Sequence, residues 1–115
     1  MNVDLKVEFD KGATKAELSQ RWKRGLMVAT SELRRYSNQY VRWLSGTMMK
    51  SSFIHSDLRK GLVVYDTPYA HLAYYNETSH VTTDHNPNAR PKWGEYAIDH
   101  HLKDIERTVQ REVSR

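Results

Sequence analysis

The first nine residues alternate between apolar and polar side chains. The residues on the apolar side are Val3, Leu5, Val7 and Phe9, and charged residues lie between them. A period of two is typical of a strand with one buried face, so we predict a β-strand over residues 3–9.

The next segment has the period of an amphipathic helix. Thr14 and Glu17 have capping-box spacing, in which hydroxyl and carboxylate each accept a free backbone amide at a helix start. Apolar residues then recur at intervals of three and four: Leu18, Trp22, Leu26, Ala29, Leu33, Tyr36 and Tyr40. This pattern predicts one long helix with a continuous buried stripe, ending at Ser45-Gly46.

Residues 47–66 have the pattern of a β-hairpin. Two short runs, Thr47–His55 and Gly61–Asp66, flank a turn sequence near SDLRKG, and short connections favour antiparallel pairing. Thr67-Pro68 ends the second run, because proline has no amide to donate to a sheet. Pro68 also suits the first turn of a helix, so a short helix is predicted after it.

The remaining sequence predicts a polar loop followed by a helix. Residues 78–88 are polar and without period, which is typical of a loop. An amphipathic helix is predicted from the spacing of Trp93, Ala97, Ile98, Leu102, Ile105, Val109 and Val113. The predicted fold is therefore a single α+β domain over residues 1–115. It has β-α-β-β-α order, with a small antiparallel sheet against two long amphipathic helices and a short helix after the third strand.

Composition narrows the class of protein. Only 38% of the residues are hydrophobic and the mean hydropathy is −0.80, so neighbouring subunits are a plausible second source of burial. The absence of cysteine excludes disulfides and thiolate catalysis, and it fits a reducing cytoplasm. No apolar run approaches the roughly 20 residues that cross a bilayer, so no membrane partner is expected.

Positive charge is concentrated in the predicted first helix. Residues 11–42 hold eight basic and two acidic side chains, a net +6, which leaves −2 for the rest of a chain of net charge +4. Arg24, Arg35 and Arg42 fall opposite the apolar stripe and are predicted to face outward. They are candidate contacts for DNA or an acidic partner, although a solvated helix face has the same pattern.

Catalytic and metal-binding patterns are absent from the sequence. The six histidines lack the helical spacing of a zinc protease, and there is neither a nucleophile elbow nor a phosphate-binding glycine loop. We therefore expect no catalytic residue, no metal and no cofactor. One alternative is a small basic endoribonuclease or toxin, which would use a group around the hairpin: His55, Arg59, Lys60 and Tyr65. Another is a nucleic-acid-binding regulator, with affinity that weakens steeply with salt.

Four ordered motifs follow the long helix: a degraded turn "YVRWLSGTMMKS", then "PYA", a tyrosine pair, and "NPNA" before a tryptophan. The residues that carry them are Tyr40, Gly46, Ser51, Pro68, Tyr69, Ala70, Tyr74, Tyr75, Asn86, Pro87 and Trp93. In this order they resemble the small minor capsid proteins of the head–tail connector region of long-tailed bacteriophages and prophages, and the related tail-completion proteins. The chain departs from the family pattern at Arg42, Leu44 and Met49, where proline, aspartate and leucine are usual.

The resemblance implies a structural virion protein that is not an enzyme. It would form a homo-oligomeric ring at the neck, after assembly in the host cytoplasm, with portal or connector and tail proteins as partners. Packaged DNA in the channel is a further candidate partner. The tyrosines are then packing residues, with Tyr69 expected over the sheet edge. Two polar segments become candidate assembly loops, represented by Ser56, Asp57, Arg59 and Lys60 and by Thr82, Asp84 and His85.

Overall fold

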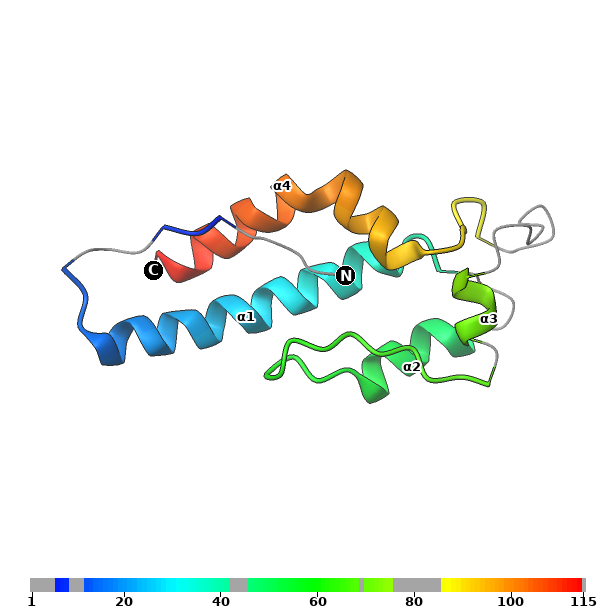
Figure 1. Ribbon diagram of the computed structural model, residues 1–115, viewed down its shortest axis with the longest axis horizontal. Helices are drawn as coiled ribbons and strands as arrows, with labels where there is room; N and C mark the ends of the chain where they lie inside the picture. The colour runs from blue at the N-terminus through cyan, green and yellow to red at the C-terminus, as the bar shows by residue number, and fades with distance from the viewer. Residues whose placement is uncertain (1–5, 9–11, 42–45, 69, 76–85, 115) are drawn as a thin grey trace.

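Four helices make up the regular secondary structure that we describe (Figure 1). The computed structural model describes residues 6–8, 12–41, 46–68, 70–75 and 86–114. The helices are α1 (Lys15–Ser37), α2 (Thr47–His55), α3 (Ala70–Tyr75) and α4 (Trp93–Val113). The molecule is elongated, measuring 54 × 24 × 20 Å along its principal axes.

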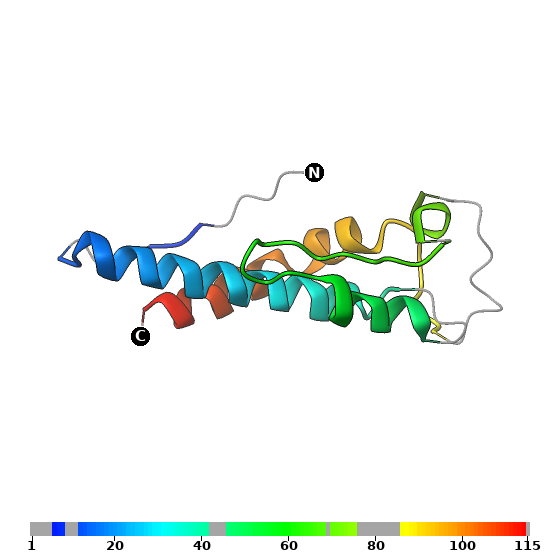
Figure 2. The same ribbon diagram turned by 90° about the horizontal axis from the view of Figure 1, so that it is seen from below.

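The two long helices, α1 and α4, pack side by side in opposite directions (Figures 1 and 2). Ile105, Val109 and Val113 of α4 form the buried centre of their contact. Half-buried apolar residues of α1 and the amino-terminal segment pack against this centre: Val7, Val28, Ala29 and Tyr36. Gly25 allows the close approach of the helices, because a Cβ atom there would lie 2.8 Å from Cγ1 of Val113. The predicted C-terminal helix is confirmed over its full length.

The predicted capping box begins α1. The Glu17 amide donates to the Thr14 hydroxyl over 3.2 Å, and the Thr14 amide donates to the Glu17 carboxylate over 3.3 Å. The helix ends at Ser37, earlier than the predicted end at Ser45-Gly46. A turn follows at residues 38–40, with the Tyr40 amide donating to the Ser37 carbonyl over 2.9 Å, and residues 42–45 lie outside the described ranges. The buried Asn38 is used instead for contacts with α2 and the segment after it.

The predicted first strand of the hairpin is wrong, because Thr47–His55 forms helix α2. Gly46 precedes it with φ of 78°, a left-handed conformation that glycine adopts without steric cost. Two serines then bond back to the preceding turn: the Ser51 hydroxyl donates to the Met48 carbonyl and the Ser52 hydroxyl to the Met49 carbonyl, each over 2.6 Å. Their small side chains are buried, so the helix packs closely on the end of α1.

The predicted second strand, Gly61–Asp66, is also wrong as a strand. The chain does reverse at SDLRKG as predicted, and Asp57 and Leu62 exchange two backbone hydrogen bonds of 2.9 Å. This single antiparallel bridge is the only β-pairing within the described ranges. With Thr47–His55 helical, Gly61–Asp66 has no strand beside it.

The described part of the predicted amino-terminal strand does not form a strand. Residues 6–8 form no strand, and residues 3–5 and 9 lie outside the described part of the chain. The Glu8 backbone amide and carbonyl instead bond the Gln110 side chain over 2.8 and 2.9 Å. The Lys6 amide donates to the Glu106 carboxylate over 3.3 Å. The α+β class with an antiparallel sheet is therefore wrong, and the described residues form a helical fold without a sheet.

The short helix predicted after Pro68 is confirmed as α3, which begins at Ala70. The Ala70 amide donates to the Thr67 carbonyl over 3.2 Å, so the turn containing Pro68 leads directly into the helix. The predicted loop at residues 78–88 is described only from residue 86 onward, and its earlier part lies outside the described ranges.

Candidate functional site

Several of the family-motif residues meet where the end of α1, α2, α3 and the start of α4 come together (Figure 1). We call this region the aromatic junction and define it by Tyr40, Val41, Met48, Tyr65, Ala70, Tyr74 and Trp93. Trp93 lies at its centre and is only 1% exposed. Its ring meets Tyr65 and Tyr74 edge to face, with ring centroids 5.3 and 4.7 Å apart. Such pairs each contribute about 0.5–1.5 kcal/mol beyond area burial, so they fix the relative positions of the helices.

A buried polar network lies beside the junction. The Tyr65 hydroxyl donates to the Asn38 amide oxygen over 2.7 Å, and the Asn38 amide nitrogen donates to the Ser52 hydroxyl over 3.1 Å. Burial raises the pKa of the Tyr65 hydroxyl well above its usual range, so the group stays protonated as a donor. Burial also raises the pKa of Tyr74. These hydrogen bonds stabilise the contact of α1 with α2 and the following loop.

The segment before α4 is bonded to the end of α1. The Asn86 side-chain amide donates to the carbonyls of Gln39 and Val41, each over 2.9 Å. The Arg90 amide donates to the Tyr40 carbonyl over 3.1 Å, and the Lys92 amide to the Tyr74 carbonyl over 2.7 Å. The asparagine of the "NPNA" motif therefore acts as a structural clamp.

A second group of rings joins α1 to α4. Tyr36 stacks on His101 with centroids 4.1 Å apart, and the Tyr40 hydroxyl lies 2.7 Å from Nε2 of His101. Tyr40 meets Tyr96 edge to face at 4.6 Å, and the Arg90 guanidinium covers the Tyr96 ring at 4.0 Å. The side chains fill a helix interface, so they are packing partners of one another.

The structure brings together part of the motif set predicted from sequence. Tyr40, Ala70, Tyr74 and Trp93 pack in the junction, and Ser51 joins it by accepting the Asp66 amide over 3.1 Å. Gly46 precedes α2, and Asn86 forms the clamp. Pro68, Pro87 and Tyr75 are exposed at its edge, where Tyr75 meets Tyr74 edge to face. Tyr69 lies outside the described residues.

Two of the three arginines predicted to face outward, Arg24 and Arg35, lie in the described residues. The Arg35 guanidinium pairs with the Glu32 carboxylate at 2.6 Å and also covers the Tyr36 ring at 4.3 Å. The Glu32 hydrogen bond raises the pKa of Arg35. Arg24 is exposed on the first half of α1, and Arg42 lies outside the described residues.

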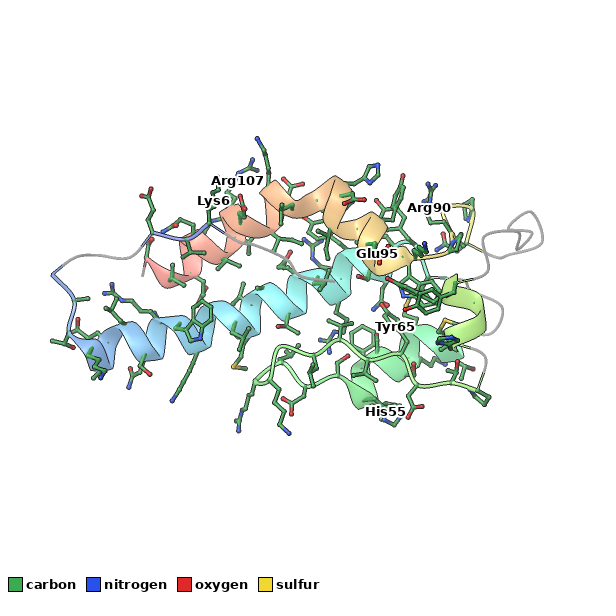
Figure 3. All side chains as sticks on the ribbon, in the orientation of Figure 1. Lys6, His55, Tyr65, Arg90, Glu95 and Arg107 are labelled. Atoms are coloured by element: carbon green, nitrogen blue, oxygen red, sulfur yellow. The ribbon has the colours of Figure 1, made fainter. Side chains whose placement is uncertain are left out.

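The alternative catalytic group does not converge on a site. The Tyr65 hydroxyl is directed inward to Asn38, whereas His55 lies at the outer edge of α2 (Figure 3). Arg59 and Lys60 are exposed in the turn, where their backbone amides donate to the Asp57 carboxylate over 3.1 and 3.3 Å. A buried, protonated tyrosine hydroxyl is a poor general base, so this arrangement gives no support to nuclease chemistry.

The first candidate assembly loop folds back on the protein. The Val64 amide donates to the Ser56 hydroxyl over 2.9 Å, and Gly61 lies against Leu26 and Thr30 of α1. The other candidate loop residues, Thr82, Asp84 and His85, lie outside the described ranges.

The described part of the chain has neither a metal-binding group nor a membrane-spanning helix. There, no three His, Asp or Glu side chains are grouped so as to hold a metal ion. None of the helices formed by these residues is both long and apolar enough to cross a membrane.

Sequence reasoning missed the residues that hold the junction together by polar contacts. Asn38 and Ser52 belong to no motif. Asn38 is a polar residue at the end of a helical stripe and Ser52 is a serine in an apolar run, and neither pattern predicts a buried hydrogen bond. His101 is one of the six histidines that lack metal-site spacing, and its role in packing was not predicted. Its partners Tyr36 and Tyr40 lie more than sixty positions away in the sequence.

These features define an elongated helical protein in which several of the described motif residues form a packed core, the class expected of a structural component. The family comparison agrees with this class. The chain matches the family model described as minor capsid protein over residues 3–113, and it belongs to this bacteriophage family. No curated protein and no solved structure matches it. The protein is therefore a phage structural protein and a component of the virion, with other virion proteins as its partners.

Proposed function

We propose that the protein forms a homo-oligomeric ring at the phage neck, between the portal or connector and the tail. In this position it is needed for head–tail joining or tail completion. Membership of the minor capsid family supports a virion role. The order of the "PYA", tyrosine-pair and "NPNA" motifs, which resembles that of connector-region proteins, supports the neck in particular.

The observation that carries the proposal is that several motif residues hold the helices together. Trp93, Tyr74 and Ala70 are packed together, and Asn86 clamps the segment before α4 to the end of α1. A set of residues that fixes the angles among four helices determines the shape of a rigid building block. An enzyme of this size would instead be expected to present polar side chains in a pocket.

Tail joining is tested by a phage carrying a stop codon early in the gene. The expected result is DNA-filled heads and separate, complete tails in the lysate, seen by negative-stain electron microscopy. Supplying the wild-type protein from a plasmid should restore tailed particles. Normal tailed particles from the mutant, without the plasmid, would overturn the neck assignment.

The aromatic junction supplies a matched pair of variants for the same assay. Plasmid-borne Trp93→Ala should fail to restore tailed particles, because it removes the centre of the junction. Tyr75→Ala changes an exposed ring at the edge of the junction and should restore them. Both variants are quantified in the lysate, so that a loss of protein is separated from a loss of joining.

A further inference from the structure

The net charge of the described residues is carried by α1, α2 and the loop after α2. In Figure 1, α1 lies between α4 on one side and α2 with its loop on the other. Residues 12–41 and 46–68, which contain α1, α2 and this loop, hold nine basic and four acidic side chains, a net charge of +5. Residues 86–114, which contain α4, hold five of each, and the other described residues add no net charge.

We call residues 12–41 and 46–68 the basic side of the molecule. Seven of its nine basic residues have exposed side chains, and Arg21 and Arg34 are half-buried. The nine residues are Lys15, Arg21, Lys23, Arg24, Arg34, Arg35, Lys50, Arg59 and Lys60.

All four acidic side chains of the basic side already have a partner within the chain. The partners are the Thr14 amide for Glu17, the Arg35 guanidinium for Glu32, the amides of Arg59 and Lys60 for Asp57, and the His55 ring for Asp66. The cations differ from these acids. Arg35 is the one lysine or arginine of this side that forms an ion pair among the described residues. The Arg34 guanidinium covers the Phe53 ring at 4.5 Å instead.

The cations without an ion pair extend along the molecule. Lys15 and Arg34 lie on the same helix, nineteen positions apart, which corresponds to about 28 Å at ~1.5 Å per residue. Duplex DNA carries one phosphate charge per ~1.7 Å of its axis, so about eight base pairs cover this length with a continuous row of negative charge. The surface of a soluble protein usually mixes both signs of charge over such a distance. Among anionic partners, DNA therefore matches the spread of the cations best.

We propose that the basic side binds the phosphate backbone of DNA. A sequence pI of about 9.4, with the positive charge on one part of the structure, is the electrostatic pattern of nucleic-acid-binding domains. Lysine and arginine contacts to phosphates carry no base information, so the binding is independent of DNA sequence. The inference goes beyond the proposed neck ring, because it concerns the single chain and needs no other virion protein.

Fluorescence anisotropy measures binding of the purified protein to a labelled duplex of about 24 base pairs, three times the length that the helix spans. The expected dissociation constant is in the micromolar range at about 100 mM NaCl and is the same for duplexes of unrelated sequence. Raising NaCl from about 50 to about 200 mM should weaken binding at least about tenfold, because each phosphate contact releases counterions. The proposal is overturned if no binding is detected at about 50 mM NaCl with about 100 μM protein.

Charge-removing variants locate the binding surface. Lys23→Ala combined with Arg24→Ala removes two exposed cations of the basic side. The matched control, Lys103→Ala combined with Arg107→Ala, removes two exposed cations of α4, where Arg107 lies on the edge away from α1 and α2 (Figure 3). Each double variant lowers the net charge of the protein by the same amount. A difference between them therefore reports the place of the charges and not their sum.

The first double variant should weaken DNA binding at least about fivefold and reduce the salt slope by about 2, because two phosphate contacts are lost. The α4 variant should change the affinity by less than about twofold. Equal losses in the two variants, or a larger loss in the α4 variant, would overturn the proposal. Circular dichroism verifies that both variants keep the helical content of the wild type.

Competition distinguishes DNA from other anionic partners. Unlabelled duplex, polyglutamate and vesicles that contain an anionic lipid are each added to the labelled complex at equal total negative charge. The duplex should displace the probe at the lowest concentration, because its phosphates are the most closely spaced charges. Equal displacement by polyglutamate would assign the surface to acidic proteins, and equal displacement by vesicles would assign it to membranes; either result overturns the proposal. The assay uses the purified chain, so its failure leaves the tail-joining result unaffected.

Discussion

At the scale of single residues, the fold depends on polar contacts that lie inside apolar surroundings. Tyr65 has its ring against Trp93 and its hydroxyl on Asn38, so one side chain serves both the aromatic junction and the polar network. Asn38 in turn bonds Ser52 of α2. Removing one member of this network leaves a buried polar group without a hydrogen-bond partner. The free energy of unfolding then falls by about 1–3 kcal/mol.

Because of Tyr65, we expect the free energy of unfolding to depend on pH in the alkaline range. Burial raises its pKa in the folded state above the ~10 of an unfolded tyrosine, so folding favours the protonated form. This contribution is complete below pH ~10 and is lost as the pH rises through the folded-state pKa. We expect the free energy of unfolding of the wild type to fall more steeply above pH ~10 than that of Tyr65→Phe.

Urea denaturation at a series of pH values measures both proteins. Tyr65→Phe retains a weaker dependence, because the pKa of Tyr74 is also raised by burial. At neutral pH the variant should be less stable by about 1 kcal/mol, since Asn38 loses a donor. Parallel curves for the two proteins above pH ~10 would contradict the burial of the hydroxyl.

At position 25 we expect alanine to give no gain in stability over glycine, although alanine is usually the better residue in a helix. Alanine gains about 1 kcal/mol of helix propensity, but its Cβ would lie 2.8 Å from Cγ1 of Val113. Overpacking of this kind costs about 1–3 kcal/mol, so Gly25→Ala should lower the free energy of unfolding or leave no gain. Gln20→Ala, at an exposed position of the same helix, is the control.

A double variant separates the steric cost from other effects. Val113→Ala removes the methyl group that an alanine at position 25 would meet. In the Val113→Ala background, Gly25→Ala should therefore stabilise, and the two changes should be non-additive. Gly25→Ala raising the stability of the wild type by the full propensity gain would contradict close packing at this position.

At the scale of elements, patterns with strong local chemistry predicted the structure and short apolar runs did not. The capping box of Thr14 and Glu17 and the stripe of α4 were sufficient because they are helix signals in themselves. Thr47–His55 is nine residues long, too short for apolar spacing to separate helix from strand. Because this segment is helical, no neighbouring strand is available to Gly61–Asp66 or to residues 6–8. The predicted sheet therefore does not form in the described residues.

The helical state of α2 is tested at Lys50, which is exposed in the middle of that helix. Lys50→Gly should lower the free energy of unfolding by about 1 kcal/mol, and Lys50→Val by a few tenths, because both are weaker helix formers. Lys50→Ala should be neutral or slightly stabilising. In a strand the order would differ, since valine is favoured there. A stabilising Lys50→Val would contradict α2 as a helix.

The candidate site was predictable only in part, for the same physical reasons. The motif order identified Tyr40, Ala70, Tyr74 and Trp93 as a set, and the junction joins them. Their partners Asn38 and Ser52 depend on tertiary contacts, which the period of the sequence does not encode. Arg35 was predicted to face outward, and its side chain is exposed, while the Glu32 carboxylate one turn earlier pairs with it.

At the scale of the whole molecule, the scarcity of apolar residues has a structural counterpart. A chain that is only 38% hydrophobic forms an elongated body that has two small buried clusters and leaves several large apolar side chains exposed. Such a body is suited to completing its burial against neighbours in a virion. The elongated shape and the membership of the minor capsid family both support the proposed neck ring.

The position of the protein in purified virions tests the neck proposal most directly. A short epitope tag is placed after Ser114, at the exposed end of α4, and located by gold-labelled antibody in electron micrographs. The account predicts gold particles at the junction of head and tail in tailed particles. Label distributed over the capsid shell, or tagged protein absent from purified virions, would contradict it.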